Sequence, residues 1–412
     1  MRKSLLLLFL ITSVLGSTYA QWVKCNLPAG VYPWSMAISG NYIYLGTLAN
    51  GMYVSSDKGS SWQEINNGIN LKQVWSVSVA EDAVYAGTNN GGLFRTKDKG
   101  TSWAAVNSGI ASTTIVRSVV KFNNKLFATT SNQGVLISTD NAATWTQHNS
   151  GIVGLVASQL LVVDDALYVG VLQKVYKYDS TNSKWIAASA GIVNNTISAL
   201  TFFKESSGTV NLIAGISDSK SVYRSIDSGT NWTAAYAGLP GVPVATVAAK
   251  GTTIFAGNDY GVYVSKDSGS SWTDASTGFS RASYATNLTI SDQDIYVIQS
   301  ALVWRRSFAE FGITAAPDIA SDNAAEKSLK CFPNPFSDRA TISYRLQSSS
   351  YVSLAIFDLS GALVHEIISE IQPAGSYNCQ LSAGRINLLS GTYIVKLTTD
   401  KFVQTQKMVL VN

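Results

Sequence analysis

An eight-residue pattern, Ser-x-Asp-x-Gly-x-x-Trp, constrains the fold of this chain more than any other feature. Full copies occupy residues 55–62, 225–232 and 265–272, and weaker copies occupy 96–103 and 138–145. A more eroded copy ends at Trp185, with Tyr178, Ser180 and Asn182 at the three polar positions. The six tryptophans are therefore 41, 42, 40, 47 and 40 residues apart. A period near 42 fits the ~40–45 residues of one four-stranded propeller blade and is too long for most helical repeats.

The pattern itself has the composition of a hairpin turn between two strands. Asp accepts hydrogen bonds from its own turn, Gly adopts positive φ, and Trp offers a large apolar face to a neighbouring sheet. We therefore interpret the pattern residues as structural, and not as catalytic acids or calcium ligands. They are Ser55, Asp57, Gly59, Trp62, Asp98, Gly100, Trp103, Asp140, Trp145, Ser225, Asp227, Gly229, Trp232, Ser265, Asp267, Gly269 and Trp272.

Each repeat is predicted to contain four strands, which lie at 34–39, 42–47, 52–56 and 62–65 in the first copy. Equivalent first strands start near residues 75, 116, 158, 197, 244 and 285, which gives seven units. The seventh has three strands and no final turn, whereas residues 22–26 have the register of 62–66. We therefore predict an all-β chain with a seven-bladed propeller over residues 21–311, closed by its N-terminal strand so that no sheet edge stays open.

The N-terminal 20 residues are predicted to be a secretory signal peptide, with a basic start, an apolar run at 5–15 and small residues before Gln21. The run is too short to span a membrane, and we expect no transmembrane segment elsewhere. Without Arg2 and Lys3, the formal charge is 28 − 26 = +2, which gives no reason to expect nucleic acid as a partner.

The C-terminal part of the chain loses the repeat. Residues 312–330 have the composition of a linker, and residues 331–412 contain several short alternating strands, which predict a small Ig-like β-sandwich. The three cysteines are too few for a disulfide scaffold. A bridge between Cys331 and Cys379 and a pair of buried free thiols both remain open.

The repeated pattern resembles the Asp-box of bacterial-neuraminidase-type (BNR) repeats, which sialidases, sortilin-like receptors, xyloglucanases and photosystem-assembly factors share. That resemblance implies a propeller and says little about activity, because one fold serves unrelated functions.

The tail resembles the type A sorting domain of the type IX secretion system over its whole length. The matching residues are Pro333, Asn334, Pro335, the run 358–361, Gly391, Tyr393, and Lys407 with 408–411. The family usually has Tyr where Phe332 stands. The resemblance implies that the type IX machinery is a partner and that the protein is secreted, extracellular or attached at the outer-membrane surface of a diderm bacterium. The alternative is an ordinary β-sandwich module that the mature protein keeps.

Ligands of propellers usually bind at the face formed by the loops that join one sheet to the next and the second strand to the third. The side chains expected there are Lys72, Asn90, Arg117, Asn132, Lys174, Asn195, Asp218, Lys220, Asp259, Tyr260, Arg281 and Tyr284. From these we select Asn90, Asn132, Lys174, Asp218, Asp259 and Tyr260 as candidate ligand-binding residues. They are polar side chains that can bind sugars or peptides without reacting, although such loop residues are often simply solvated.

The pattern of charged residues favours a binding protein over an enzyme. Sialidase activity is not expected, because four of the six propeller arginines lie on third strands and no glutamate is placed to assist a tyrosine nucleophile. Two histidines in different domains predict neither a metal site nor a triad, and we expect no cofactor. The alternative is a glycoside hydrolase with Asp218 and Asp259 as its two carboxyl groups. No catalytic residue is assigned.

Overall fold

The structure is a computed structural model that describes residues 21–192, 196–218, 222–279, 284–313, 329–346, 350–358, 362–373, 375–386, 388–399 and 403–411. The chain divides into two compact units, residues 1–314 and 315–412. The predicted signal peptide and most of the predicted linker lie outside the described residues. Within the described ranges, no helix has both the length and the apolar character needed to cross a membrane.

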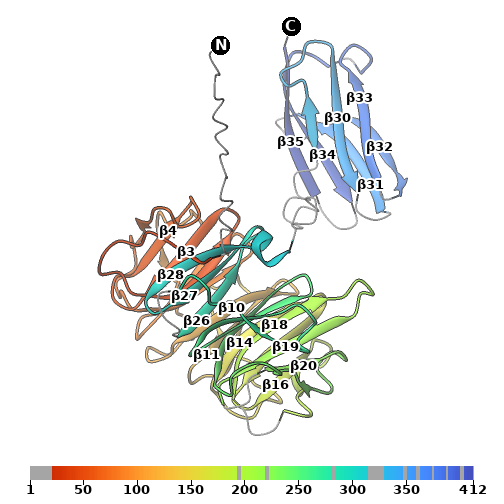
Figure 1. The fold of residues 1–412 in the computed structure, drawn as a ribbon. Helices are drawn as coiled ribbons and strands as arrows, with labels where there is room; N and C mark the ends of the chain where they lie inside the picture. Colours follow the sequence, from red (N-terminus) through yellow and green to blue (C-terminus); the bar gives the residue numbers. More distant parts are fainter. Residues whose placement is uncertain are drawn as a thin grey trace, which may run out of the picture. The chain divides into compact units, whose positions relative to one another are not determined.

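The first unit is built of four-stranded antiparallel sheets, seven of them within the described residues. In the first six sheets the four strands follow one another along the chain (Figure 1). Their bounds are β2 Pro33–Ser39, β3 Tyr42–Thr47, β4 Met52–Ser55, β5 Gln63–Glu64; β6 Val74–Ala80, β7 Ala83–Thr88, β8 Gly92–Thr96, β9 Ala104–Ala105; β10 Val116–Phe122, β11 Lys125–Thr130, β12 Val135–Ser138, β13 Thr146–Gln147; β14 Ala157–Val163, β15 Ala166–Val171, β16 Lys174–Asp179, β17 Lys184–Ala187; β18 Ile197–Lys204, β19 Val210–Ile216, β20 Val222–Ser225, β21 Thr233–Ala234; β22 Val244–Lys250, β23 Thr253–Asn258, β24 Gly261–Ser265 and β25 Thr273–Asp274.

The seventh sheet joins the two ends of this unit. Its strands are β26 (Ala285–Ile290), β27 (Asp294–Gln299), β28 (Leu302–Ser307) and β1 (Val23–Lys24), and a short 3-10 helix, η1 (Phe308–Phe311), follows. Val23 pairs with Arg305 and Lys24 with Trp304. In Figure 1 the teal strands β27 and β28 accordingly lie beside the red strands β3 and β4. The N-terminal strand thus supplies the fourth strand of the last sheet.

The first strands of the sheets form a closed ring. Each packs against the first strand of the next sheet, from β2 and β6 around to β26, which packs against β2. The apolar core is divided into clusters, each of which joins two neighbouring sheets. The cluster around Leu45 and Tyr296, for example, joins the first sheet to the seventh. This arrangement is propeller-like, and the apolar contacts between neighbouring sheets stabilise it.

Five of the six repeated tryptophans bond their sheet to the one before it, whereas the buried indole N–H of Trp62 has no hydrogen-bond partner among the described residues. The indole N–H of Trp103 donates to the carbonyl of Ile65 at 2.8 Å, and Trp145, Trp185, Trp232 and Trp272 make the corresponding bonds. Trp22 does the same for the seventh sheet, since its indole N–H donates to the carbonyl of Ala275 at 2.7 Å and its side chain is buried. Trp22, the second residue after the predicted signal peptide, therefore takes the place of a repeated tryptophan in the seventh sheet.

The turn at residues 55–62 illustrates the hydrogen bonding of the repeated pattern. The Ser55 hydroxyl donates to Asp57 Oδ1 at 2.8 Å and accepts from the Gly59 N–H at 2.9 Å, while the N–H and hydroxyl of Ser61 both donate to Asp57. Gly59 has φ +83°, and a Cβ there would lie 2.6 Å from Cys25 Sγ. The aspartate oxygens are thus occupied within the turn.

The turn before Trp185 differs from the expectation. Its acceptor is Asp179, which receives the N–H groups of Thr181 and Asn182, and not the residues at the aligned positions 178, 180 and 182. The physical reason is that β16 and β17 stay paired up to Asp179 and Lys184, which leaves a shorter turn.

The second unit contains a three-stranded and a four-stranded sheet that share one core. The strands are β29 Lys330–Phe332, β30 Arg339–Leu346, β31 Ser350–Phe357, β32 Leu363–Gln372, β33 Gly375–Ser382, β34 Gly391–Thr399 and β35 Val403–Leu410. Asn334 links its ends, because its side chain donates to the Lys407 carbonyl at 2.7 Å and accepts from the Val409 N–H at 2.9 Å. The motif residues near 334 and 407 are thereby brought together.

The two cysteines of this unit are free. Cys331 and Cys379 both pair with Ile342, from opposite sides of β30. Two strand spacings separate their backbones by about 9.5 Å, beyond the ~7 Å that a disulfide can bridge. Burial raises the pKa of both thiols.

Candidate functional site

Each first strand carries an irregularity close to its beginning. The register between the first and second strands of every sheet shifts there by one residue, which is the pattern of a β-bulge. A bulge redirects the side chain of the extra residue, and bulges are frequent next to binding sites. The bulged residues are Trp34, Trp75, Arg117, Ser158 with Gln159, Ser198, Ala245 and Thr286.

All of these residues line one cavity of about 600 Å³ at the centre of the ring, which we call the central channel. All seven first strands contribute to its wall. Its volume lies within the ~300–1,000 Å³ that small-ligand sites occupy. Among the described residues that line it, Arg117 is the one charged side chain, and none is Asp, Glu, His or Cys.

Most polar side chains of the channel wall are occupied by hydrogen bonds between neighbouring sheets. The Ser35 hydroxyl accepts from the Val77 N–H at 2.9 Å, and the Gln159 carboxamide accepts from the Leu200 N–H at 2.9 Å. The Ser198 hydroxyl donates to the Val244 carbonyl at 2.6 Å. These groups satisfy backbone atoms and are therefore structural.

Trp34, Trp75 and Arg117 remain available. They belong to three consecutive sheets, and in the described part of the chain neither their indole N–H groups nor the guanidinium has a hydrogen-bond or ion-pair partner. The two indoles meet edge to face, with ring centroids 5.1 Å apart and an interplanar angle of 64°. Trp75 is 37% exposed. The channel mouth, which we define by these three residues, thus offers aromatic surface beside one cation.

The channel walls partly desolvate the Arg117 guanidinium although water still reaches it, and this burial lowers its pKa. Arginine nevertheless keeps its charge in proteins. Reduced access to water strengthens any interaction that this charge makes, because the effective dielectric constant is lower than in bulk solvent.

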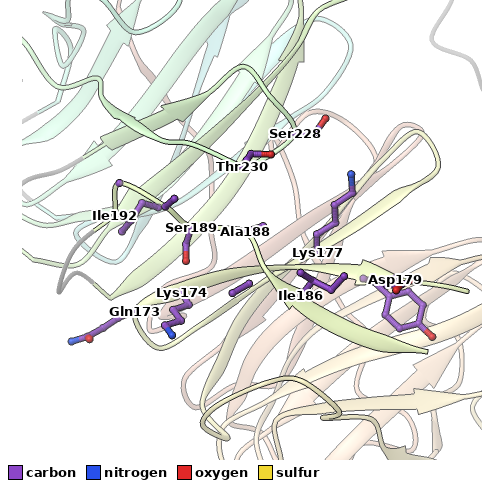
Figure 2. Close-up of a pocket in the computed structure, with 14 residues that line it drawn as sticks. Gln173, Lys174, Lys177, Asp179, Ile186, Ala188, Ser189, Ile192, Ser228 and Thr230 are labelled. Atoms are coloured by element: carbon purple, nitrogen blue, oxygen red, sulfur yellow. The ribbon is translucent and has the colours of Figure 1, made fainter. Parts of the chain in front are cut away.

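A second hollow of about 790 Å³ lies between the fourth and fifth sheets and is called the peripheral pocket. Figure 2 shows Gln173 and Lys174 at one end of it and Asp179 at the other. The pocket opens where Ser189 replaces the asparagine of earlier repeats. The Asn66 side chain, at the equivalent position, accepts from the Met52 N–H at 2.7 Å, whereas the Ser189 hydroxyl has no hydrogen-bond partner among the described residues.

Five of the six candidate residues from the sequence lie in loops and Lys174 begins β16, and none of the six lines the central channel. Asn132 accepts from the Thr114 hydroxyl, and Asp218 accepts from the Thr196 N–H. Both side chains are therefore used in hydrogen bonds that stabilise the loops around them. Lys174 lines the peripheral pocket. Asn90 has φ 58° in a turn after β7, and Asp259 precedes the half-exposed Tyr260 in the turn before β24.

Of the wider set, Arg117 lines the channel, Lys72 pairs with Glu64, and Tyr284 is exposed. Asn195, Lys220 and Arg281 lie outside the described residues. The sequence predicts strands that begin at Trp34 and near Trp75, and it does not identify these two residues as binding residues. The signal that could have found them is the sequence Trp, Trp, Arg at the same position of three consecutive repeats, where the later repeats have Ser, Ser, Ala and Thr.

The described residues do not meet the requirements of a metal site. Within the described ranges, no group of three or more His, Cys, Asp and Glu side chains lies close enough to hold a metal ion. Acid and base groups are also missing from the channel wall described above. The arrangement can therefore stack on and hydrogen-bond a ligand.

A known protein family matches most of the first unit. Residues 84–315, more than half of the 412 residues, match the DUF6242 beta propeller domain. The chain belongs to the DUF6242 beta propeller family. Residues 330–411 match the secretion system C-terminal sorting domain, which confirms the recognition of the tail and indicates that this DUF6242 propeller is secreted to the cell surface. A search of curated proteins gives no match.

Solved structures share the fold of this DUF6242 protein at low sequence identity. The extracellular domain of BT4673 from B. thetaiotaomicron has 14% identity and a TM-score of 0.59, with 94% of this chain and 52% of that chain covered. YCF48 from Cyanidioschyzon merolae has 14% identity and a TM-score of 0.56, with 70% and 98% covered. Virginiamycin B lyase from Staphylococcus aureus has 13% identity and a TM-score of 0.58, with 70% and 99% covered. At such identities the likeness concerns the fold alone.

Proposed function

We propose that this chain is a secreted or cell-surface binding protein that holds an extracellular glycan or protein ligand at the channel mouth. The observation that carries the proposal is the group Trp34, Trp75 and Arg117, three side chains without partners in the described residues that face one cavity. Large side chains left free in a channel where most other polar groups are hydrogen-bonded are suited to contact a ligand.

The same cavity supports binding over catalysis. Acid and base chemistry needs titratable groups within reach of the reacting atoms. The alternative, a glycoside hydrolase, requires two carboxyl groups roughly 5–10 Å apart across a bound sugar. The described channel wall contains no carboxyl group, and Asp218 is bonded within its own loop.

The proposal includes the finer architecture and the route of export. The seven sheets over residues 21–311 are the blades of a seven-bladed propeller, because their first strands pack as one closed ring. Residues 331–412 form an Ig-like β-sandwich after a linker at 312–330, as two sheets around one core support. The type IX secretion machinery binds this domain and exports the protein.

The test is an array of glycans and extracellular proteins, combined with a panel of chromogenic glycosides. Saturable binding without turnover is expected, and Trp34→Ala or Trp75→Ala should weaken it at least tenfold, whereas Trp75→Phe should keep most of it. Loss of binding in Tyr260→Ala but not in Trp34→Ala would move the site to the outer loops. Turnover that disappears in Asp218→Asn or Asp259→Asn would favour the hydrolase.

A further inference from the structure

The charge at the channel mouth has no counter-charge in the described protein. Arg117 forms no ion pair there, and the channel wall contains no acidic side chain. Several other cations of this unit have acidic partners, for example Arg224 with Glu205 at 3.0 Å and Lys58 with Asp294 at 3.1 Å. A guanidinium that is confined by a cavity wall and lacks an acid is suited to an anionic ligand, and it matches the planar shape of a carboxylate.

The neighbouring indoles add a second requirement. Because Trp34 and Trp75 meet edge to face, they cannot fill each other's ring faces as two stacked rings would. A ligand group that covers such a face must be flat and apolar on one side. One face of a pyranose ring is of this kind, since its C–H bonds point outward while the hydroxyl groups lie around its edge.

From these two features we infer that the ligand is a glycan whose terminal sugar carries a carboxylate, such as a uronic acid. The carboxylate binds Arg117, and the sugar ring packs on the Trp34 and Trp75 pair. This inference rests on the proposed binding function and specifies its ligand.

The shape of the site favours the end of a glycan over a peptide. An extended peptide gains affinity by adding to an open sheet edge, but the first strands at the channel are already paired with the second strands and face one another around a ring. Two tryptophans and one arginine on three consecutive sheets occupy one side of the mouth, which suits one or two sugar units.

The test uses the full chain and pairs of oligosaccharides that differ in one group, ending in galacturonate or galactose and in glucuronate or glucose. The wild-type protein should bind the acidic member at least tenfold more tightly. In Arg117→Gln this preference should vanish, and Arg117→Lys should restore part of it. The matched control is Lys266→Gln, which removes one exposed positive charge from the turn after β24 and should leave the preference unchanged. Added salt should weaken acidic binding more than neutral binding.

The outcomes separate the ligand class from the binding function. Equal affinity for the acidic and neutral oligosaccharides, or an unchanged preference in Arg117→Gln, would overturn the ligand class. If Trp75→Ala then still lost oligosaccharide binding, the channel would remain the binding site. Binding of a protein but of no glycan would overturn the ligand class as well. Every variant must have the melting temperature of the wild-type protein, because this excludes misfolding as the cause of lost binding.

Discussion

At the scale of single residues, the aspartates of the repeated turns are committed to structure. Hydrogen bonds from the Thr144 hydroxyl, the Thr144 N–H and the Ser138 hydroxyl lower the pKa of Asp140 from 3.8 to about 2. Asp57 and Asp98 are lowered to about 2 by the same kinds of bond. A carboxyl whose pKa falls on folding stabilises the native state above its unfolded pKa and loses this contribution as the pH falls through the folded value. These turns should therefore weaken between about pH 4 and pH 2.

The first prediction follows for Asp140→Asn. This variant should melt at a lower temperature than wild type at pH 7, because an amide accepts the two Thr144 bonds less well than a carboxylate. It should also lose less stability between pH 4 and pH 2, since the titrating group is gone. Thermal unfolding followed by circular dichroism measures both effects. Asp292→Asn, at an exposed position outside these turns, is the control and should keep the wild-type pH dependence.

At the scale of secondary-structure elements, β1 is short and yet makes well-defined contacts. Trp22 is buried, stacks on Phe279 at 5.1 Å, and bonds to the seventh sheet's neighbour through both its indole and its backbone N–H. Trp22→Ala should lower the free energy of unfolding by about 3–5 kcal/mol, as large-to-small core substitutions do. Denaturant titration measures this. Trp75→Ala, at an exposed position, should change it far less, and equal effects of the two would contradict the role of β1.

Asn334 provides the corresponding prediction for the tail. Asn334→Ala removes two hydrogen bonds that tie the segment after β29 to β35, each of which contributes about 0.5–1.5 kcal/mol. Amide hydrogen exchange of residues 407–411 should therefore become faster in the full chain. Asn378→Ala, at an exposed position on β33, should leave that exchange unchanged.

The strands show how much of the fold the sequence can predict. The second strand at 42–47 was predicted with the bounds of β3, and the pairing of the N-terminal strand with the last sheet follows from the absent seventh turn. The fourth strand of the first sheet, β5 (Gln63–Glu64), is shorter than the predicted 62–65. Alternation along a strand does not reveal a bulge, so the sequence places Arg117 at the ligand face but does not predict that Trp34 and Trp75 turn inward beside it.

At the scale of the whole molecule, the two units have separate tasks. The first contains its own clusters and the channel, and the second contains its own core and the sorting residues. Deletion of residues 329–412 should therefore leave a folded propeller that accumulates in the periplasm, because the export signal is lost while the ring is intact. Cell fractionation with surface proteolysis measures this. Arg117→Gln in the full chain should reach the surface normally, and surface exposure of the truncated protein would contradict the prediction.

The position of β1 also determines the order in which the protein is completed. A chain is synthesised from its N-terminus, so β1 is made first, but its partner β28 comes last in the ring; the Trp22 indole bonds to a residue 253 positions away. The entropy cost of closing a loop grows only with the logarithm of its length, so a loop this long costs little more to close than a shorter one. A product that stops before Leu302 has no strand for β1 to join. The ring can therefore close only after the last strand of the propeller, β28, has been synthesised.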